Sequence, residues 1–299
     1  MVWSFSAHGS FRKCPRQWFY KKLYASSLAN DPIRREAHRL SKLEGLLAWR
    51  GKIVDSVISE SIVPSVSSKR TFTLDDAIRQ ANHLFAEQRA RRMLSGEEGG
   101  FLESEYGIPL TEEMFGNALN EIHVALEKFY EADSVWSLLT SARVLIPQRT
   151  LSFRHGDSTI QVRPDLIAFY GPLAPVVFDW KVNARPLRDY WLQLVTGAIA
   201  LTRCTPHRDW PNGATTQHGP HEIQLFEVQL LTGDVRVHRA SAADVEEAED
   251  FISASASEMH FACAGDASDH LGPDDLPVTS NPFTCQTCPF RKICWRSQP

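Results

Sequence analysis

Two acids and a lysine in the middle of the chain have types and spacing that could support metal-assisted chemistry. Asp165 lies in one predicted β-strand, residues 163–169, and Asp179 and Lys181 lie in the next, residues 176–182. Side chains alternate along a strand, so Asp179 and Lys181 share one face. Carboxylates suit a hard divalent cation, and a lysine beside them can orient or deprotonate an attacking water. The set predicts metal-assisted hydrolysis of a phosphodiester.

The Asp179–Lys181 pair taken alone also fits a solvated pair on an edge strand. Pro164 directly precedes Asp165, and this favours the catalytic interpretation. Pro-Asp, a spacer and then Asp-x-Lys resembles the signature of the PD-(D/E)XK nucleases.

Composition sets limits on the kind of protein. The 299 residues carry a net charge of −4, which argues against non-specific coating of nucleic acid but not against a local basic groove. No apolar run approaches the length of a membrane span, and the first residues lack the pattern of a secretion signal. We therefore expect a cytoplasmic protein with reduced thiols. The absence of a Gly-Lys-Ser/Thr loop gives no support for an ATPase.

The elements that must position these residues follow from periodicity and turn signals. We expect helices after Cys14 and over residues 45–62, 74–132, 187–202 and 242–257, with the third broken around residues 96–107. Hairpins are predicted for residues 143–154 with 158–169 and for residues 223–231 with 235–238. Residues 26–44 and 63–72 are expected to be a mobile connection and a loop. Residues 74–135 are interpreted as a helical insertion that covers one side of the core.

Four cysteines form a second constellation. Cys285, Cys288 and Cys294 follow one another closely, and Cys14 is the best supplier of a fourth thiolate. Thiolate-only ligation suits zinc or an iron–sulfur cluster, and spacing alone leaves both open. Cys204 and Cys263 have no such neighbours and are expected to be small buried hydrophobes.

Almost the whole length of the chain resembles the RecB-like iron–sulfur nucleases of the AddB and CRISPR-associated adaptation types. The resemblance implies one α/β nuclease domain over residues 1–299, with a restriction-endonuclease-like mixed sheet flanked by helices. It implies a [4Fe–4S] cluster, rather than Zn²⁺, held by Cys14 with the segment 281–299, which would staple the two ends of the chain together. It further implies Mg²⁺- or Mn²⁺-dependent cleavage of DNA.

The resemblance also assigns roles to the residues of the site. Asp165 and Asp179 would bind the divalent ion, with Asp55 as a third ligand and the Trp180 carbonyl as a possible fourth. Lys181 would position the water, and Gln193 would orient the lysine or the scissile strand.

Two departures from the family pattern are visible in these helices. Asp55 stands where related enzymes usually present a histidine, and it could equally be a solvated helix residue. Gly197 stands where the Q-x-x-x-Y motif has a tyrosine, and Tyr190, a turn before Gln193, is the candidate to replace it.

The expected function is therefore a metal-dependent DNA nuclease, an exonuclease on single strands or DNA ends, with a helicase or integrase as a potential protein partner. An alternative is a catalytically weak subunit that binds DNA ends or serves as a scaffold. A zinc-stapled RNA-binding module would leave the acids and the lysine unexplained. Basic residues near Cys14 are expected on a solvated face, or along a phosphate backbone together with Arg291 and Lys292; they are Arg12, Lys13, Arg16, Lys21 and Lys22.

Overall fold

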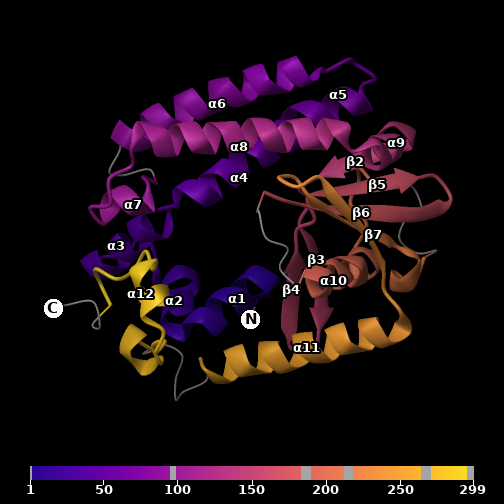
Figure 1. Cartoon of the computed structure of the whole chain (residues 1–299). Coiled ribbons are helices and arrows are strands. Elements are labelled where there is room, and N and C mark those ends of the chain that lie inside the picture. Colours follow the sequence, from indigo (N-terminus) through magenta and orange to yellow (C-terminus); the bar gives the residue numbers. More distant parts are fainter. Residues whose placement is uncertain (1, 95–98, 183–189, 212–217, 264–270, 295–299) are drawn as a thin grey trace.

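The computed structural model describes residues 2–94, 99–182, 190–211, 218–263 and 271–294 (Figure 1). Its centre is a five-stranded mixed sheet in the order β2-β5-β6-β7-β8. The strands are β2 (Val144–Pro147), β5 (Leu166–Tyr170), β6 (Leu173–Lys181), β7 (Gln224–Gln229) and β8 (Asp234–Arg239). β6 and β7 run parallel, and the other neighbours are antiparallel. The predicted mixed α/β fold is confirmed in this form.

The first predicted hairpin is present, but it is shared between two sheets. β2 pairs with β5, and β3 (Leu151–His155) pairs with β4 (Ser158–Val162). Pro147 lies opposite Leu166 and Leu151 opposite Val162, so the register continues across three unpaired residues on each side. β1 (Val2–Trp3) joins β4 in parallel and completes a separate three-stranded sheet.

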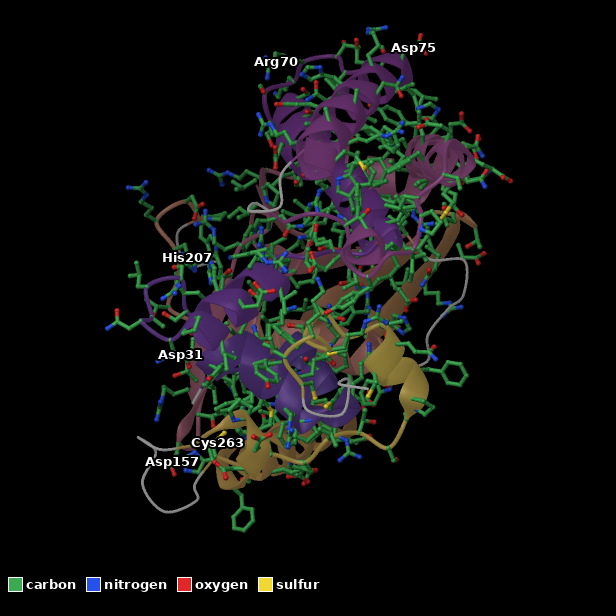
Figure 2. All side chains as sticks on the ribbon, turned by 90° about the vertical axis from the view of Figure 1, so that its left-hand side faces the viewer. Asp31, Arg70, Asp75, Asp157, His207 and Cys263 are labelled. Atoms are coloured by element: carbon green, nitrogen blue, oxygen red, sulfur yellow. The ribbon has the colours of Figure 1, made fainter. Side chains whose placement is uncertain are left out.

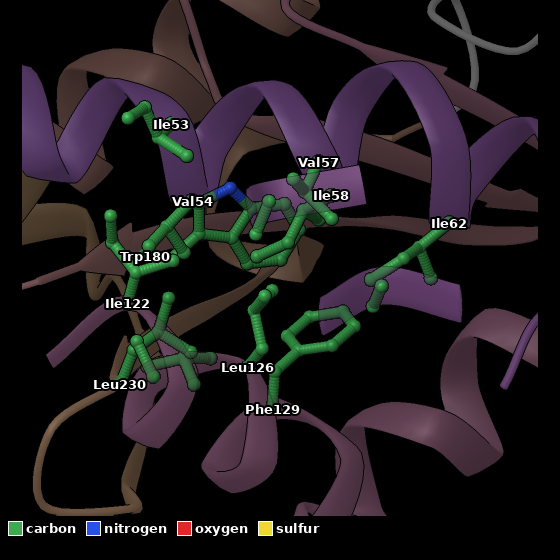
Figure 3. Close-up of a cluster of buried hydrophobic side chains, with 14 of the residues drawn as sticks. Ile53, Val54, Val57, Ile58, Ile62, Ile122, Leu126, Phe129, Trp180 and Leu230 are labelled. Atoms are coloured by element: carbon green, nitrogen blue, oxygen red, sulfur yellow. The ribbon is translucent and has the colours of Figure 1, made fainter. Parts of the chain in front are cut away.

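One face of the central sheet is covered by α4 (Leu46–Val57), which continues into a π-helical turn, Ile58–Ile62. α6 (Leu74–Leu94) and α8 (Glu112–Glu131) pack along α4, while α7 (Leu102–Glu105) lies near α3 (Pro32–Ser41) and α9 (Asp133–Ser141) lies beside β5. Figure 3 shows the core between α4, α8 and the sheet, where Ile53, Phe129 and Trp180 meet. The region expected to be helical is therefore helical, although residues 95–98 of its expected break lie outside the described residues.

The other face is covered by α10 (Tyr190–Arg203), α11 (Ala242–Phe261), α1 (Phe5–Lys13) and α2 (Pro15–Phe19). Ser241 caps α11 as expected, since its hydroxyl accepts from Asp244 N, and the helix runs beyond residue 257. The predicted start of the α10 helix at residues 187–189 lies outside the described residues. Figure 2 shows Asp157, at the tip of the β3–β4 hairpin, beside Cys263, just beyond α11, with Arg70 and Asp75 at the opposite end of the molecule.

Two expectations about the helices were wrong, and one helix was not foreseen. Residues 26–44 contain α3 (Pro32–Ser41), which Asp31 caps by accepting from Ile33 N at 2.8 Å, so this segment is not a mobile connection. Residues 63–72 begin with α5 (Val63–Ser67). α1 was not foreseen, although Ser4 accepts from Ala7 N and caps it. For α3 and α1, the capping role of a polar residue before the helix was overlooked; α5 has no side-chain cap and continues directly from the π-helical turn Ile58–Ile62.

The two ends of the described chain meet beside α2. α2 continues into a π-helical turn, Tyr20–Tyr24, and α12 (Pro282–Gln286) lies close to both. The expectation that Arg16 lies on a solvated face was wrong: the residue is 4% exposed, and its guanidinium donates to Leu276 O at 3.0 Å. Short 3₁₀ turns at Pro220–Glu222 and Pro273–Asp275 complete the elements. None of the helices described is long and apolar enough to cross a membrane.

Candidate active site

The end of β6 places an acid and a lysine on one face of an inner strand. Asp179 is 4% exposed, and its Oδ2 lies 2.6 Å from Lys181 Nζ. Phe178 and Trp180 point to the opposite face, into the core beneath α4. The alternation predicted for this strand is therefore present. Because β6 lies between β5 and β7, the interpretation as a solvated pair on an edge strand is wrong.

Asp165 lies at the break in the long hairpin, immediately before β5. Its Oδ2 accepts a hydrogen bond from Trp180 N at 2.7 Å, in the strand that carries Asp179 and Lys181. The first carboxylate is thereby fixed to the second strand through its backbone. The pairing of β5 with β6 brings the Pro-Asp and Asp-x-Lys segments together.

Asp55 approaches from α4, and a residue outside the predicted set connects it to Asp165. Gln148 Nε2 donates to Asp55 Oδ1 at 2.6 Å and lies 3.3 Å from Asp165 Oδ1. Gln148 has a φ of 53° and donates its backbone N–H to Asp165 O at 3.0 Å. Its left-handed backbone, uncommon for a residue other than glycine, turns the amide toward both acids. No pattern in the sequence marks that conformation.

Gln193 reaches the site from α10 and donates from Nε2 to Asp179 Oδ1 at 3.1 Å. One turn later Gly197 packs against the sheet, where a Cβ would lie 3.9 Å from the side chains of Val162 and Val177. A larger side chain at this position would have to extend past Val162 and Val177, which lie at ordinary contact distance from a Cβ. The side chain of Tyr190 lies outside the described residues.

All the predicted site residues line one hollow of about 300 Å³ between α4, β6 and α10. They are Asp55, Asp165, Asp179, Trp180, Lys181 and Gln193. Within the described ranges, no three His, Cys, Asp or Glu side chains are grouped so that they could hold a metal ion. The structure brings the predicted residues together around one hollow. Their roles as metal ligands and catalytic groups remain predictions.

Enclosure of three acids in one hollow disfavours their charged forms. Burial raises the pKa of Asp165 well above its usual range, the charges of Asp179 and Asp55 raise it further, and Lys181 lowers it. Burial also raises the pKa of Asp179, although the charge of Lys181 and its hydrogen bond lower it. Burial likewise raises the pKa of Asp55, although the side chains of Trp180 and Gln148 lower it. By donor chemistry this oxygen-rich set, with its unfavourable negative charge, suits a hard divalent cation, although the described acids are not grouped as a complete ligand set.

Sequence reasoning also missed a buried acid next to the site. Glu227 is 2% exposed and lies opposite Asp179 in the parallel pair of β6 and β7. It accepts from Gln229 Nε2 at 2.7 Å, and its charge contributes to the raised pKa of Asp179. The available signal was that Glu227 and Gln229 alternate with apolar residues in β7. That Asp179 lies opposite Glu227 could not be known from the sequence.

The four predicted cysteines line a second hollow, between α2 and the C-terminal segment; they are Cys14, Cys285, Cys288 and Cys294. None of the six cysteines, all of which are described, forms a disulfide. Burial raises the pKa of Cys288 to about 12, and the charges of the other three thiols contribute. By donor chemistry four thiols suit a soft metal or an iron–sulfur cluster, which binds the thiolate form, although the four are not grouped as a complete ligand set. Of the other two cysteines, Cys204 is buried as expected, and Cys263 is half-buried.

Comparisons with known proteins identify a family for the chain. A family model described as the PD-(D/E)XK nuclease superfamily matches residues 2–295. Among solved structures, SSO0001 is 13% identical, with 66% of this chain and 80% of that chain covered and a TM-score of 0.30. A candidate exonuclease from Eubacterium rectale is 9% identical, with coverage of 79% and 86% and a TM-score of 0.31. Likenesses this distant carry no weight here. No curated protein was found to match the chain.

Proposed function

Since the chain belongs to the PD-(D/E)XK nuclease superfamily, we propose that it is a metal-dependent deoxyribonuclease that uses the hollow between α4, β6 and α10. The observation that carries the proposal is convergence. Asp55, Asp165, Asp179 and Lys181 come from a helix, a hairpin break and an inner strand, yet they line the same hollow. Nucleases of this superfamily generally use divalent metals.

The proposed roles follow from the contacts of each residue. Asp165 and Asp179 are the main ligands of Mg²⁺ or Mn²⁺, with Asp55 and the Trp180 carbonyl completing the protein's share. A bound divalent cation supplies Lewis-acid stabilisation of the charge that develops on the phosphodiester. Lys181, now paired with Asp179, orients the attacking water and stabilises negative charge on the phosphate. Gln193 holds Asp179 in place through its amide.

We propose that the cysteine hollow holds a [4Fe–4S] cluster, with Zn²⁺ as the less favoured occupant. Support comes from the four thiols that line the hollow. One cysteine far upstream of a group of three matches the pattern of the iron–sulfur nucleases, whereas zinc sites usually have two closely spaced pairs. The role proposed for this site is structural, because it joins α2 to the C-terminal segment. Single strands or DNA ends are the proposed substrate, in the cytoplasm and with a helicase or integrase as a potential partner.

The decisive experiment measures cleavage of end-labelled DNA by protein purified without oxygen. The wild-type protein should cut with Mg²⁺ or Mn²⁺ and stop with EDTA. Asp165→Asn and Lys181→Ala should each reduce the rate at least about 10³-fold while the melting temperature stays high. Asp157→Asn, at the hairpin tip, is the control and should cut normally. Full activity in either site variant would overturn the assignment, and DNA binding without cutting by the wild type would favour the scaffold alternative.

A further inference from the structure

Helix α4 has two faces of different character. Trp49, Ile53 and Val57 are fully buried and pack into the core between the sheet and α8. The opposite face lines the catalytic hollow and carries Leu47, Ala48, Gly51, Lys52 and Asp55. An outward helix face in a soluble protein is ordinarily polar. The apolar part of this strip, next to the acids, therefore points to a ligand.

The strip leads directly to the proposed metal ligands. Leu47, Gly51 and Asp55 are each four residues apart and so form one row along the helix. Leu47 is 66% exposed, and Ala48 beside it is also exposed. A row of small and aliphatic side chains thus leads along α4 to Asp55. A substrate that reaches the acids would pass over this row.

Positive charge flanks the same strip. Lys52 on α4 is exposed and pairs with Glu44, which also pairs with Arg92 at 2.7 Å. Lys21 is exposed in the π-helical turn after α2. Partial burial of the ammonium lowers the pKa of Lys21, the charges of Lys22 and Lys52 lower it further, and Glu44 raises it, so lysines from two separate elements act on one another. Close like charges at the edge of a hollow favour the binding of an anion.

We propose that this surface of α4 binds an unpaired nucleic-acid strand next to the scissile bond, with Leu47 and Ala48 against bases or sugars and Lys52 and Lys21 against phosphates. The charge of the lysines and the continuity with the acids select nucleic acid as the occupant. An unpaired strand offers base faces to apolar side chains, whereas a duplex stacks its bases inside. The inference deepens the proposed function, on which it rests for the class of substrate.

Binding is tested in the Asp165→Asn background, so that the strand is not consumed, with labelled oligothymidylate and a blunt duplex of equal length. Leu47→Ser should weaken single-strand binding about five- to tenfold and leave duplex binding unchanged. Leu173→Ser is the matched control, because Leu173 is 67% exposed at the other end of β6. Lys52→Gln should lower the salt slope of single-strand binding by about 0.7, the share of one phosphate contact. Lys128→Gln, a lysine paired with Glu131 on α8, should not.

Equal effects of Leu47→Ser on the single strand and the duplex, or an effect no larger than that of Leu173→Ser, would overturn the inference. The outcome is separate from that of the nuclease proposal. A protein that never cuts but loses single-strand binding with Leu47→Ser would refute the nuclease and retain the strand site. A protein that cuts normally but binds single strands equally well with Leu47→Ser would retain the nuclease proposal and refute the strand site.

Discussion

The side chain of Gln148 reaches two carboxylates that belong to different elements. Its Nε2 lies 2.6 Å from Asp55 Oδ1 and 3.3 Å from Asp165 Oδ1. An amide N–H between two acids offsets part of their repulsion without adding a charge that would compete with a cation. Asp55 and Asp165 are proposed metal ligands, and replacing a residue that orients such ligands typically costs about 10- to 100-fold in metal affinity or activity.

Replacement of Gln148 should therefore impair catalysis more than folding. We expect Gln148→Leu to lower kcat about 10- to 100-fold, because Asp55 loses its donor and the two acids are freed to separate. Steady-state kinetics with varied Mg²⁺ would show the loss together with a raised metal requirement. Gln161→Leu, at an exposed glutamine of the same hairpin, is the control. An unchanged metal requirement in Gln148→Leu would contradict a role in positioning ligands.

The acids of the hollow should make the metal-free protein less stable as pH rises. The folded-state pKa values of Asp55, Asp165 and Asp179 are all raised. Folding therefore favours their protonated forms, and the resulting stability is present below the unfolded pKa near 4 and is lost as pH rises through the raised values. Asp165→Asn removes one of these charges.

In EDTA at pH 8, Asp165→Asn should raise the melting temperature by about 2 °C or more, with a smaller gain at pH 4. In the wild-type protein, added Mg²⁺ should produce a stabilisation that the variant lacks. Thermal denaturation at both pH values measures the effect. A variant less stable than the wild type at pH 8 would show that the hydrogen bond from Trp180 N outweighs the charge effect.

The sequence predicted part of this site because one rule, the alternation of side chains in a strand, sufficed for Asp179 and Lys181. Gln148 and Glu227 depend on which strands are neighbours and on a left-handed backbone at one residue. Neither property has a local pattern. Sequence reasoning thus found the residues of the family pattern, Gln193 included, and missed Gln148 and Glu227, which lie beside them.

At the scale of elements, the long hairpin of β2, β3, β4 and β5 contributes Asp165 to the candidate site because its strand pairing is interrupted. The register on the two sides of the break is the same, so residues 148–150 and 163–165 leave the ladder without shifting it. Asp165 lies in that break, where its side chain can meet the backbone of β6. The hairpin was predictable from its turn and apolar pattern, but the division into two sheets was not, because it depends on partners that are distant in the chain.

Helix α10 is held close to the sheet by Gly197. A Cβ there would lie at an ordinary contact distance of 3.9 Å from Val162 and Val177, but a larger side chain would have to extend past them. Gly197→Ala should be tolerated or stabilise by up to about 1 kcal/mol through helix propensity. Gly197→Tyr, which restores the family pattern, should destabilise by about 1–3 kcal/mol. Urea unfolding measures both, and a stable Gly197→Tyr would show that α10 can move outward.

At the scale of the molecule, contacts other than the cysteines already join the two ends of the chain. Arg16 donates to Leu276 O, and the ring of Tyr20 stacks on Phe290 with centroids 5.3 Å apart. The helical region takes part as well, since Tyr106 donates to Pro289 O at 2.6 Å. The C-terminal segment thus rests on α2 and on the residues after α7.

These contacts also connect the cysteine hollow to the active site. Glu103 in α7 accepts from Leu46 N, at the start of α4, at 3.0 Å. α4 in turn carries Asp55 into the catalytic hollow. Disorder of the C-terminal segment should therefore lower the cleavage rate by displacing α7 and the start of α4, which carries Asp55. The proposed cofactor need not take part in the reaction.

Removal of one thiolate should test this connection. With the proposed cluster in place, Cys288→Ser should release its iron and lower the melting temperature by about 10 °C or more, because the cofactor's binding energy would contribute to folding. Hydrogen exchange should rise in residues 282–294 and in α7, while Arg16 preserves part of the junction. Cleavage should fall about 10- to 100-fold but persist, unlike the loss in Asp165→Asn. Cys263→Ser, at a half-buried cysteine outside the set, should change none of these. Loss of iron with full activity and an unchanged exchange pattern in α7 would show that the two sites are independent.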